Sequence, residues 1–178
     1  VMTIFREREE LFLGGTMPSF TGPPPFGWVQ KIDPQTLEVI NETPQLPCGE
    51  HVWCGAIAAH QNGNIIKVNG NFMHSITNQC EVDIEKKLPI DQAHNGLLVL
   101  SDGSIVTKDL RLEGQGRSTI TRLNDKLELL HEPFLLPEGS MGRIASDKND
   151  DGEFIYIPGI KKIWKIKVEE TLSVDESW

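Results

Sequence analysis

The sequence predicts an all-β fold, a partial β-propeller, and three markers that recur in the same order carry this prediction. A Leu-Pro pair is followed by a glycine that opens an apolar segment, and a two-residue hairpin signal follows that segment. The pairs are Leu46-Pro47, Leu88-Pro89 and Leu136-Pro137; the glycines are Gly55, Gly96 and Gly142; the turns are Asn62-Gly63, Asp102-Gly103 and Asp151-Gly152. A repeat of about 40–50 residues made of short strands is typical of propeller blades.

Each repeat contains four short segments with the composition of β-strands. They are rich in the β-branched and aromatic residues that suit a pleated surface. The first strands are expected at 55–60, 96–100 and 142–146, the second at 64–68, 104–108 and 154–157, the third at 28–32, 72–76, 119–123 and 163–166, and the fourth at 37–39, 80–82 and 127–129. The hairpin glycines between first and second strands are expected to adopt positive φ.

The amino-terminal part of the chain is harder to assign. The segment from Thr3 to Leu11 is the one helix candidate, because its Glu and Arg residues are good helix formers. Residues 11–15 are expected to form the second strand of an early blade, and the Pro-rich segment 21–25 is expected to be an extended loop.

The strand count predicts one propeller segment over residues 1–178, with about three and a half four-stranded blades. Complete blades are expected at about 55–89 and 96–137, and partial blades at 11–47 and 142–168. Such a set does not close a ring. We therefore expect either a fragment of a ring of six or seven blades or a homo-oligomer in which two copies complete the ring. A β-sandwich is the alternative fold, because it shares short strands and turns.

Composition narrows the classes of partner. The net charge of −9 opposes binding to nucleic acid or to an anionic membrane surface. No segment has the ~20 consecutive apolar residues of a membrane-spanning helix. The three cysteines do not suggest a disulfide framework. The compartment is left open between cytoplasm and periplasm.

A ligand site is expected where the loops that lead into the first strands meet the loops between second and third strands, because both kinds of loop lie around the central channel of a propeller. His51, His94 and Asp109 are the candidate catalytic residues of this site. The candidate ligand-binding residues are Trp53, Asn95, Lys108 and Arg143.

The segment from His94 to Ser104 resembles the six-bladed propeller family of the senescence-marker-protein, gluconolactonase and strictosidine-synthase-like proteins. In that family an Asn-Gly pair opens the inner strand and a Ser-x-Asp-Gly turn closes it, as Asn95-Gly96 and Ser101 to Gly103 do here. The resemblance implies that Asn95 is a ligand of a divalent metal such as calcium. In the next blade the family's metal-binding Asp would fall near Arg143, where this sequence has no carboxylate.

Two further patterns could be either metal-binding sites or purely structural features. Cys48, His51 and Cys54 have a spacing that could place three ligands around zinc, but no fourth ligand follows, and partly buried cysteines beside a loop are the alternative. Asp147, Asn149 and Asp151 match the first half of a calcium loop, but the acidic residue that should complete it is missing, which favours a solvated hairpin turn.

Taken together, the sequence predicts a propeller that binds a small molecule, with a lactonase-like or esterase-like hydrolase as the catalytic hypothesis. A non-catalytic scaffold that binds a protein or peptide is the alternative. The sequence contains neither the Gly-x-Ser-x-Gly nucleophile elbow of serine hydrolases nor the glycine-rich phosphate loop of nucleotide-binding proteins.

Overall fold

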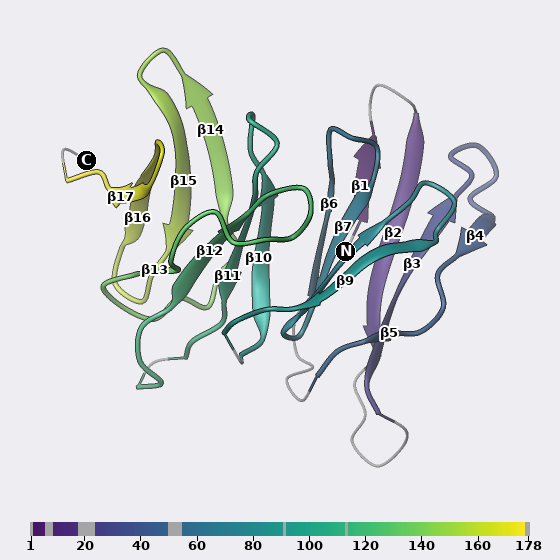
Figure 1. Ribbon diagram of the computed structural model, residues 1–178, viewed down its shortest axis with the longest axis horizontal. Helices are drawn as coiled ribbons and strands as arrows, with labels where there is room; N and C mark the ends of the chain where they lie inside the picture. The colour runs from purple at the N-terminus through teal and green to yellow at the C-terminus, as the bar shows by residue number, and fades with distance from the viewer. Residues whose placement is uncertain are drawn as a thin grey trace. The chain divides into compact units, whose positions relative to one another are not determined.

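The computed structural model describes residues 2–5, 9–17, 24–49, 55–90, 92–112 and 114–176. All regular structure in these ranges is β-strand, arranged in four sheets (Figure 1). They contain no helix, and so none that is long and apolar enough to cross a membrane. The chain divides into two compact units, residues 1–94 and 95–178, and each unit holds two of the sheets.

The first unit contains the first two sheets. The strands of the first sheet are β1 (Met2–Phe5), β2 (Glu10–Met17), β3 (Phe26–Ile32), β4 (Val39–Glu42) and β5 (Leu46–Pro47), and β5 also pairs with β3. The second sheet consists of β6 (Gly55–Ala59), β7 (Ile65–Asn69), β8 (Phe72–Ile76) and β9 (Val82–Lys87).

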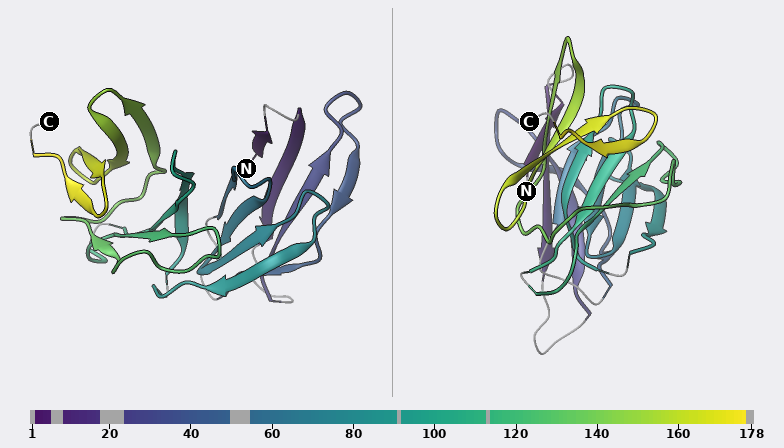
Figure 2. Two further views of the ribbon diagram at one scale, coloured as in Figure 1. Left: turned by 45° about the horizontal axis from the view of Figure 1, so that its top comes forward. Right: turned by 90° about the vertical axis from the view of Figure 1, so that its left-hand side faces the viewer.

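The second unit contains the last two sheets. The third sheet consists of β10 (His94–Val99), β11 (Ile105–Asp109), β12 (Thr119–Leu123) and β13 (Phe134–Leu135). The fourth consists of β14 (Ala145–Asn149), β15 (Gly152–Pro158), β16 (Ile163–Val168) and β17 (Leu172–Val174). In each sheet, the first four strands are hydrogen-bonded in the order of the sequence, so each sheet contains a four-stranded meander, the building unit of a propeller blade (Figure 2).

The first and last sheets contain strands beyond those expected. The helix expected from Thr3 to Leu11 is wrong, because this segment enters β1 and β2, which pair antiparallel from Met2 opposite Leu13 to Phe5 opposite Glu10. Pairing with a neighbouring strand thus overrides the helix propensity of a short segment. At the other end, β17 adds a fourth strand to the last sheet.

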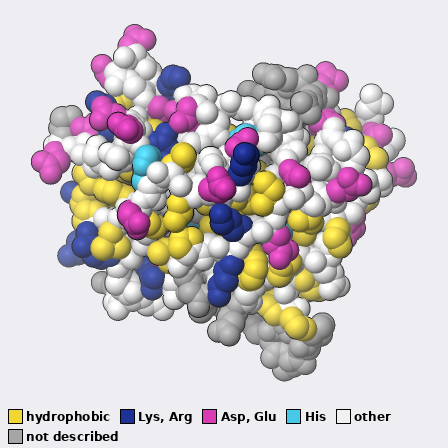
Figure 3. Space-filling model, viewed as in Figure 1, with side chains coloured by type: hydrophobic (Ala, Val, Ile, Leu, Met, Phe, Trp, Pro, Cys, Tyr) yellow, Lys and Arg dark blue, Asp and Glu magenta, His cyan; other side chains and the backbone are white. Residues whose placement is uncertain are grey.

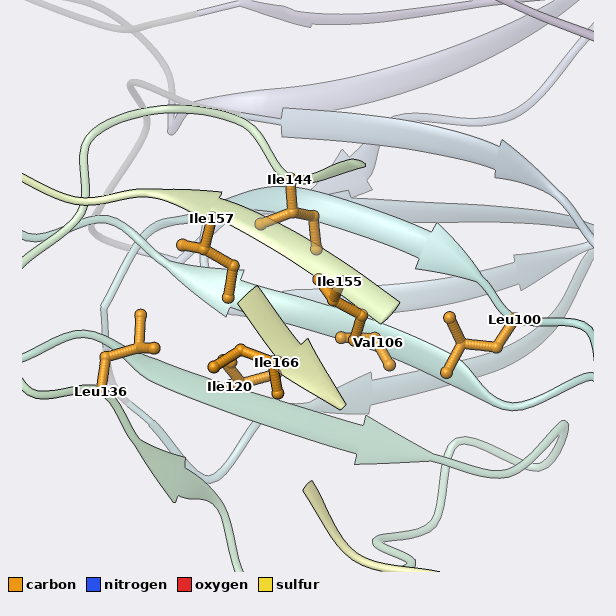
Figure 4. Packing of buried hydrophobic residues seen from close by; sticks show 8 residues of the cluster. All are labelled: Leu100, Val106, Ile120, Leu136, Ile144, Ile155, Ile157 and Ile166. Atoms are coloured by element: carbon orange, nitrogen blue, oxygen red, sulfur yellow. The ribbon is translucent and has the colours of Figure 1, made fainter. Parts of the chain in front are cut away.

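Each unit has a core between its two sheets. In the first unit, Phe12 and Val29 of the first sheet pack with Ile57, Ile65 and Ile76 of the second. In the second unit, a cluster of eight buried side chains joins the third and fourth sheets (Figure 4). Its members are Leu100, Val106, Ile120, Leu136, Ile144, Ile155, Ile157 and Ile166. Each unit thus buries apolar side chains between two sheets that pack face to face.

The Leu-Pro marker has a structural explanation. The leucine of each pair is buried, and in two sheets its backbone N–H reaches back to the loop before the third strand of the same sheet. Leu88 N donates to Asn71 O at 2.8 Å, and Leu136 N donates to Ser118 O at 2.8 Å. In the second and third sheets the marker therefore lies where the chain bonds back to the loop before the third strand.

The fourth strands begin later than expected, because the residues placed at their start lie in a turn. Leu37, Cys80 and Leu127 have φ values of 60°, 63° and 59°, and each is followed by a glutamate. This left-handed backbone conformation is uncommon for residues other than glycine, asparagine and aspartate. An apolar residue before glutamate is thus a fourth marker of the repeat. By contrast, the positive φ expected at Gly63 and Gly103 is confirmed.

Candidate functional site

The candidate site residues that the structure describes lie where β10 begins and where β11 ends. Because β10 and β11 are adjacent strands joined by the tight turn at Gly103, the start of the first lies beside the end of the second. Asn95, Lys108 and Asp109 all belong to this region. His51 and Trp53 lie outside the described residues, so the part of the site predicted around them is not described.

Asn95 is nearly buried, and only one half of its amide has a partner. Its Nδ2 donates to the backbone carbonyl of Met141 at 2.5 Å. Its Oδ1 is buried and has no hydrogen-bond partner among the described residues. Because the bond to Met141 fixes which end of the amide is the donor, the unpaired atom is an acceptor. Asn95 therefore offers one carbonyl oxygen to a hydrogen-bond donor or a cation.

Asp109 is fully buried, and both of its carboxylate oxygens are paired. Oδ1 accepts from the backbone N–H of Thr119 at 2.6 Å, and Oδ2 accepts from Arg111 Nε at 2.9 Å. The carboxylate thereby holds the start of β12 and fixes the arginine that follows β11. A buried carboxylate requires such partners, since an unpaired charge away from water is costly.

Lys108 is also fully buried, and its ammonium group is bound by backbone carbonyls. Nζ donates to Asp109 O at 2.9 Å and to Ser140 O at 3.0 Å. The side chain of Ser140 donates to Pro158 O at 2.7 Å, and its N–H donates to Ser118 Oγ at 2.8 Å. Lys108 and Ser140 therefore connect β11 to the segment that leads into β14. Sequence reasoning missed Ser118 and Ser140, which carry no pattern beyond small polar residues near a Leu-Pro pair.

His94 and Arg143 differ in their exposure. His94 is fully buried at the start of β10, and its backbone N–H donates to Gly70 O at 2.9 Å. Arg143 is exposed. Consecutive side chains of a strand point to opposite faces, so His94 and Asn95 project from opposite sides of β10. Their adjacency in sequence therefore does not make them partners, and the catalytic role of His94 stays a prediction.

A polar residue ends the second strand of both the second and the third sheet. Sequence reasoning selected the one in the third sheet, Asp109, but not the one in the second, Asn69. Asn69 ends β7 as Asp109 ends β11. Asn69 Oδ1 accepts from Thr16 Oγ1 at 2.8 Å, and its Nδ2 donates to Pro47 O at 3.2 Å and to Cys48 Sγ at 2.6 Å. In both sheets a buried amide or carboxylate at this position holds neighbouring segments together. A polar residue at the end of an apolar second strand therefore indicates a side chain that is hydrogen-bonded within the protein.

The two metal patterns find no cluster of ligands in the part of the chain that is described. No group of three His, Cys, Asp or Glu side chains there is placed to hold an ion. Asp147 and Asn149 lie on the exposed strand β14, and Asn149 Oδ1 accepts from Asp151 N within the hairpin turn. Cys48 is buried, and burial raises the pKa of its thiol to about 11, so it is protonated near neutral pH. Its expected partners His51 and Cys54 lie outside the described residues.

No family model matches the chain, and no curated protein matches it. Two solved structures resemble it in fold. One is a protein of unknown function from Bacteroides caccae, with 19% sequence identity and a TM-score of 0.60 over 92% of this chain and 55% of that chain. The other is a streptogramin B lyase, with 18% identity and a TM-score of 0.61 over 90% of this chain and 53% of that chain.

This chain therefore spans about half the length of both solved structures. At such low identity the likeness shows the fold alone. With four meander sheets and no helix among the described residues, the fold is all-β and consistent with a partial β-propeller, as the sequence predicted.

Proposed function

We propose that this chain is part of a β-propeller that binds a small molecule through the region where β10 begins. The observation that carries the proposal is the buried, unpaired Oδ1 of Asn95 beside its paired Nδ2. A buried acceptor without a partner costs about 1–3 kcal/mol. A ligand that donates a hydrogen bond to this oxygen would recover that free energy.

The described residues do not fit a calcium site around Asn95. Calcium takes six to eight oxygen ligands, whereas the neighbouring carboxylate of Asp109 is already paired on both oxygens. Among the described residues no cluster of acidic side chains is available instead. The proposal therefore assigns to Asn95 a hydrogen bond to an organic ligand rather than a place in a metal site.

We propose hydrolase or lyase chemistry within the six-bladed senescence-marker-protein and gluconolactonase group. The support is the resemblance of the segment from His94 to Ser104 and the fold shared with a streptogramin B lyase. Because His94 projects from the opposite face of β10, we do not place its ring at the ligand that Asn95 binds, and a proton acceptor for this ligand is not assigned. Lys108 and Asp109 are proposed as positioning residues, because their polar atoms already bind the sheet around them.

The test is binding and turnover of a defined panel by the wild-type chain. The panel contains lactones, simple esters and streptogramin B, with affinity measured by calorimetry and turnover by product analysis. Asn95→Ala should weaken binding at least tenfold, since the loss of a well-formed hydrogen bond is worth about 1.4 kcal/mol. Asn41→Ala is the matched control, because Asn41 also donates to a backbone carbonyl, that of Gln79, but is exposed.

Equal affinity in the wild type and Asn95→Ala would refute the proposed site. A scaffold that binds a protein or peptide is the second candidate, favoured by the complete internal pairing of Lys108 and Asp109. Absence of binding and of turnover across the panel would favour this second function.

A further inference from the structure

A row of three titratable side chains crosses the second sheet. Lys67 of β7, His74 of β8 and Glu85 of β9 are direct cross-strand partners, so they lie on one face of the sheet. Lys67 Nζ lies 3.5 Å from Thr16 Oγ1 of β2, which shows that this face packs against the first sheet. The row therefore lies in the joint between the first two sheets.

His74 is held in this joint as a neutral side chain. It is fully buried, and neither ring nitrogen has a hydrogen-bond partner among the described residues. Burial lowers the pKa of His74 to about 4, and the positive charge of Lys67 acts in the same direction. The nearest carboxylate oxygen, Glu85 Oε2, lies 3.4 Å from Nε2 on a side chain that is 45% exposed. Such an exposed charge stabilises a protonated ring only weakly.

In the described part of the first sheet, the carboxylate on the side that faces the joint is that of Glu10, whose Oε1 binds Lys31 and whose Oε2 is buried without a hydrogen-bond partner. On this side Lys31, which is paired across the sheet with Phe12, forms an ion pair of 2.6 Å with Glu10. This pair is already balanced. Protonated His74 would instead stand beside Lys67 as a second buried cation, and like charges at a buried site oppose ionisation.

The two cysteines that the structure describes are buried in the same joint. Cys48 Sγ accepts from Asn69 Nδ2 at 2.6 Å, on the face that carries Lys67. Cys80 belongs to the apolar cluster between the two sheets. Separation of the sheets would therefore expose both thiols.

We propose that this joint is an acid-sensitive latch, in which protonation of His74 separates the first two sheets and uncovers Cys48 and Cys80. Above pH 6.5 the ring is neutral in both the closed and the open form, and the full stability of the joint is present. As the pH falls from 6.5 towards 4, the open form takes up a proton that the closed form does not bind. Between pH 7 and pH 4.5 the open-to-closed ratio then rises on the order of 100-fold.

The experiment measures thiol labelling by 4,4′-dithiodipyridine, which reacts in acid, on the full chain carrying Cys54→Ser. Rates at pH 7 and pH 4.5 are divided by those of an unfolded thiol peptide at the same pH. The proposal expects the normalised rate to rise on the order of 100-fold at the lower pH. His74→Gln should remove the rise, whereas His131→Gln, a change in the other unit, should retain it.

An acid rise that persists in His74→Gln, or a wild-type rate that does not change, would overturn the proposal. If His74→Gln does not fold, the NMR titration of the His74 ring in the wild type decides the question. A ring that stays neutral down to about pH 4 supports the latch, and a ring that titrates near pH 6.5 overturns it.

Discussion

Replacement of Asp109 by alanine tests whether this carboxylate holds the third sheet together. The side chain is fully buried, and it accepts from Thr119 N and from Arg111 Nε. In Asp109→Ala the buried backbone N–H of Thr119 loses the carboxylate oxygen that accepts its hydrogen bond. In Asp109→Asn the carbonyl oxygen still accepts from Thr119, but an amide N–H₂ faces the guanidinium of Arg111.

The expected losses differ in size. A buried backbone donor left without a partner costs about 1–3 kcal/mol. Arg111 is 24% exposed, so the loss of its ion pair adds only about 0.5–1 kcal/mol. We therefore expect Asp109→Ala to lower the free energy of unfolding by about 1.5–4 kcal/mol, the sum of both effects. Asp109→Asn should cost about 0.5–1 kcal/mol, because only the contact with Arg111 is lost.

The assay is urea unfolding followed by far-ultraviolet circular dichroism, with the transition midpoint and its slope compared among variants. Asp125→Ala is the matched control, because Asp125 is exposed in the turn after β12, and it should change stability by less than about 0.5 kcal/mol. If Asp109→Ala is as stable as this control, the structural role of the carboxylate is refuted.

Three further substitutions test the repeat itself through their unfolding midpoints. Leu136→Ala should cost about 2–5 kcal/mol, because it empties a fully buried position of the cluster between the last two sheets; a loss below 1 kcal/mol would contradict the packing of this side chain in the cluster. Gly142→Ala should cost about 1–3 kcal/mol, because the added methyl group would meet the ring of Pro158 at 2.2 Å, and unchanged stability would show that this close approach is absent. Leu37→Gly should stabilise the chain by about 0.5–1 kcal/mol, because Leu37 has a φ of 60° and an exposed side chain; destabilisation would argue against the turn geometry.

Much of the fold could be predicted because its markers are local. The hairpin glycines and the apolar second strands depend on backbone geometry and on burial, which act within a few residues. The strands β7, β8, β11 and β12 lie close to the expected ranges for this reason. The amino-terminal strands could not be predicted, because pairing between β1 and β2 opposes their helix propensity.

The start of the last sheet also differs from the expectation, for a steric reason. The strand expected at 142–146 begins only at Ala145. Gly142 lies too close to Pro158 for any side chain, and Ile144 packs into the core of the unit. The glycine marks a close approach of two segments here rather than the first residue of a strand.

The candidate site was predicted only in part, because sequence shows which polar residues are present but not what they bind. Lys108 and Asp109 were chosen as ligand-binding and catalytic residues on loop position, and the structure places them inside the sheet with partners of their own. Asn95 keeps an unpaired oxygen, which no pattern of neighbouring residues could reveal. Figure 3 shows acidic and basic side chains interspersed on the face drawn, so neither sign of charge forms a continuous patch there.

The backbone hydrogen bonds from Leu88 to Asn71 and from Leu136 to Ser118 join residues that lie 17 and 18 positions apart in the sequence. Each of these two sheets is thus held by a bond between groups of its own stretch of chain, so a gene segment that encodes one such repeat also encodes this bond. Duplication or loss of one such segment would leave the internal bonds of the remaining repeats intact, which allows an ancestor to change its number of blades in single steps.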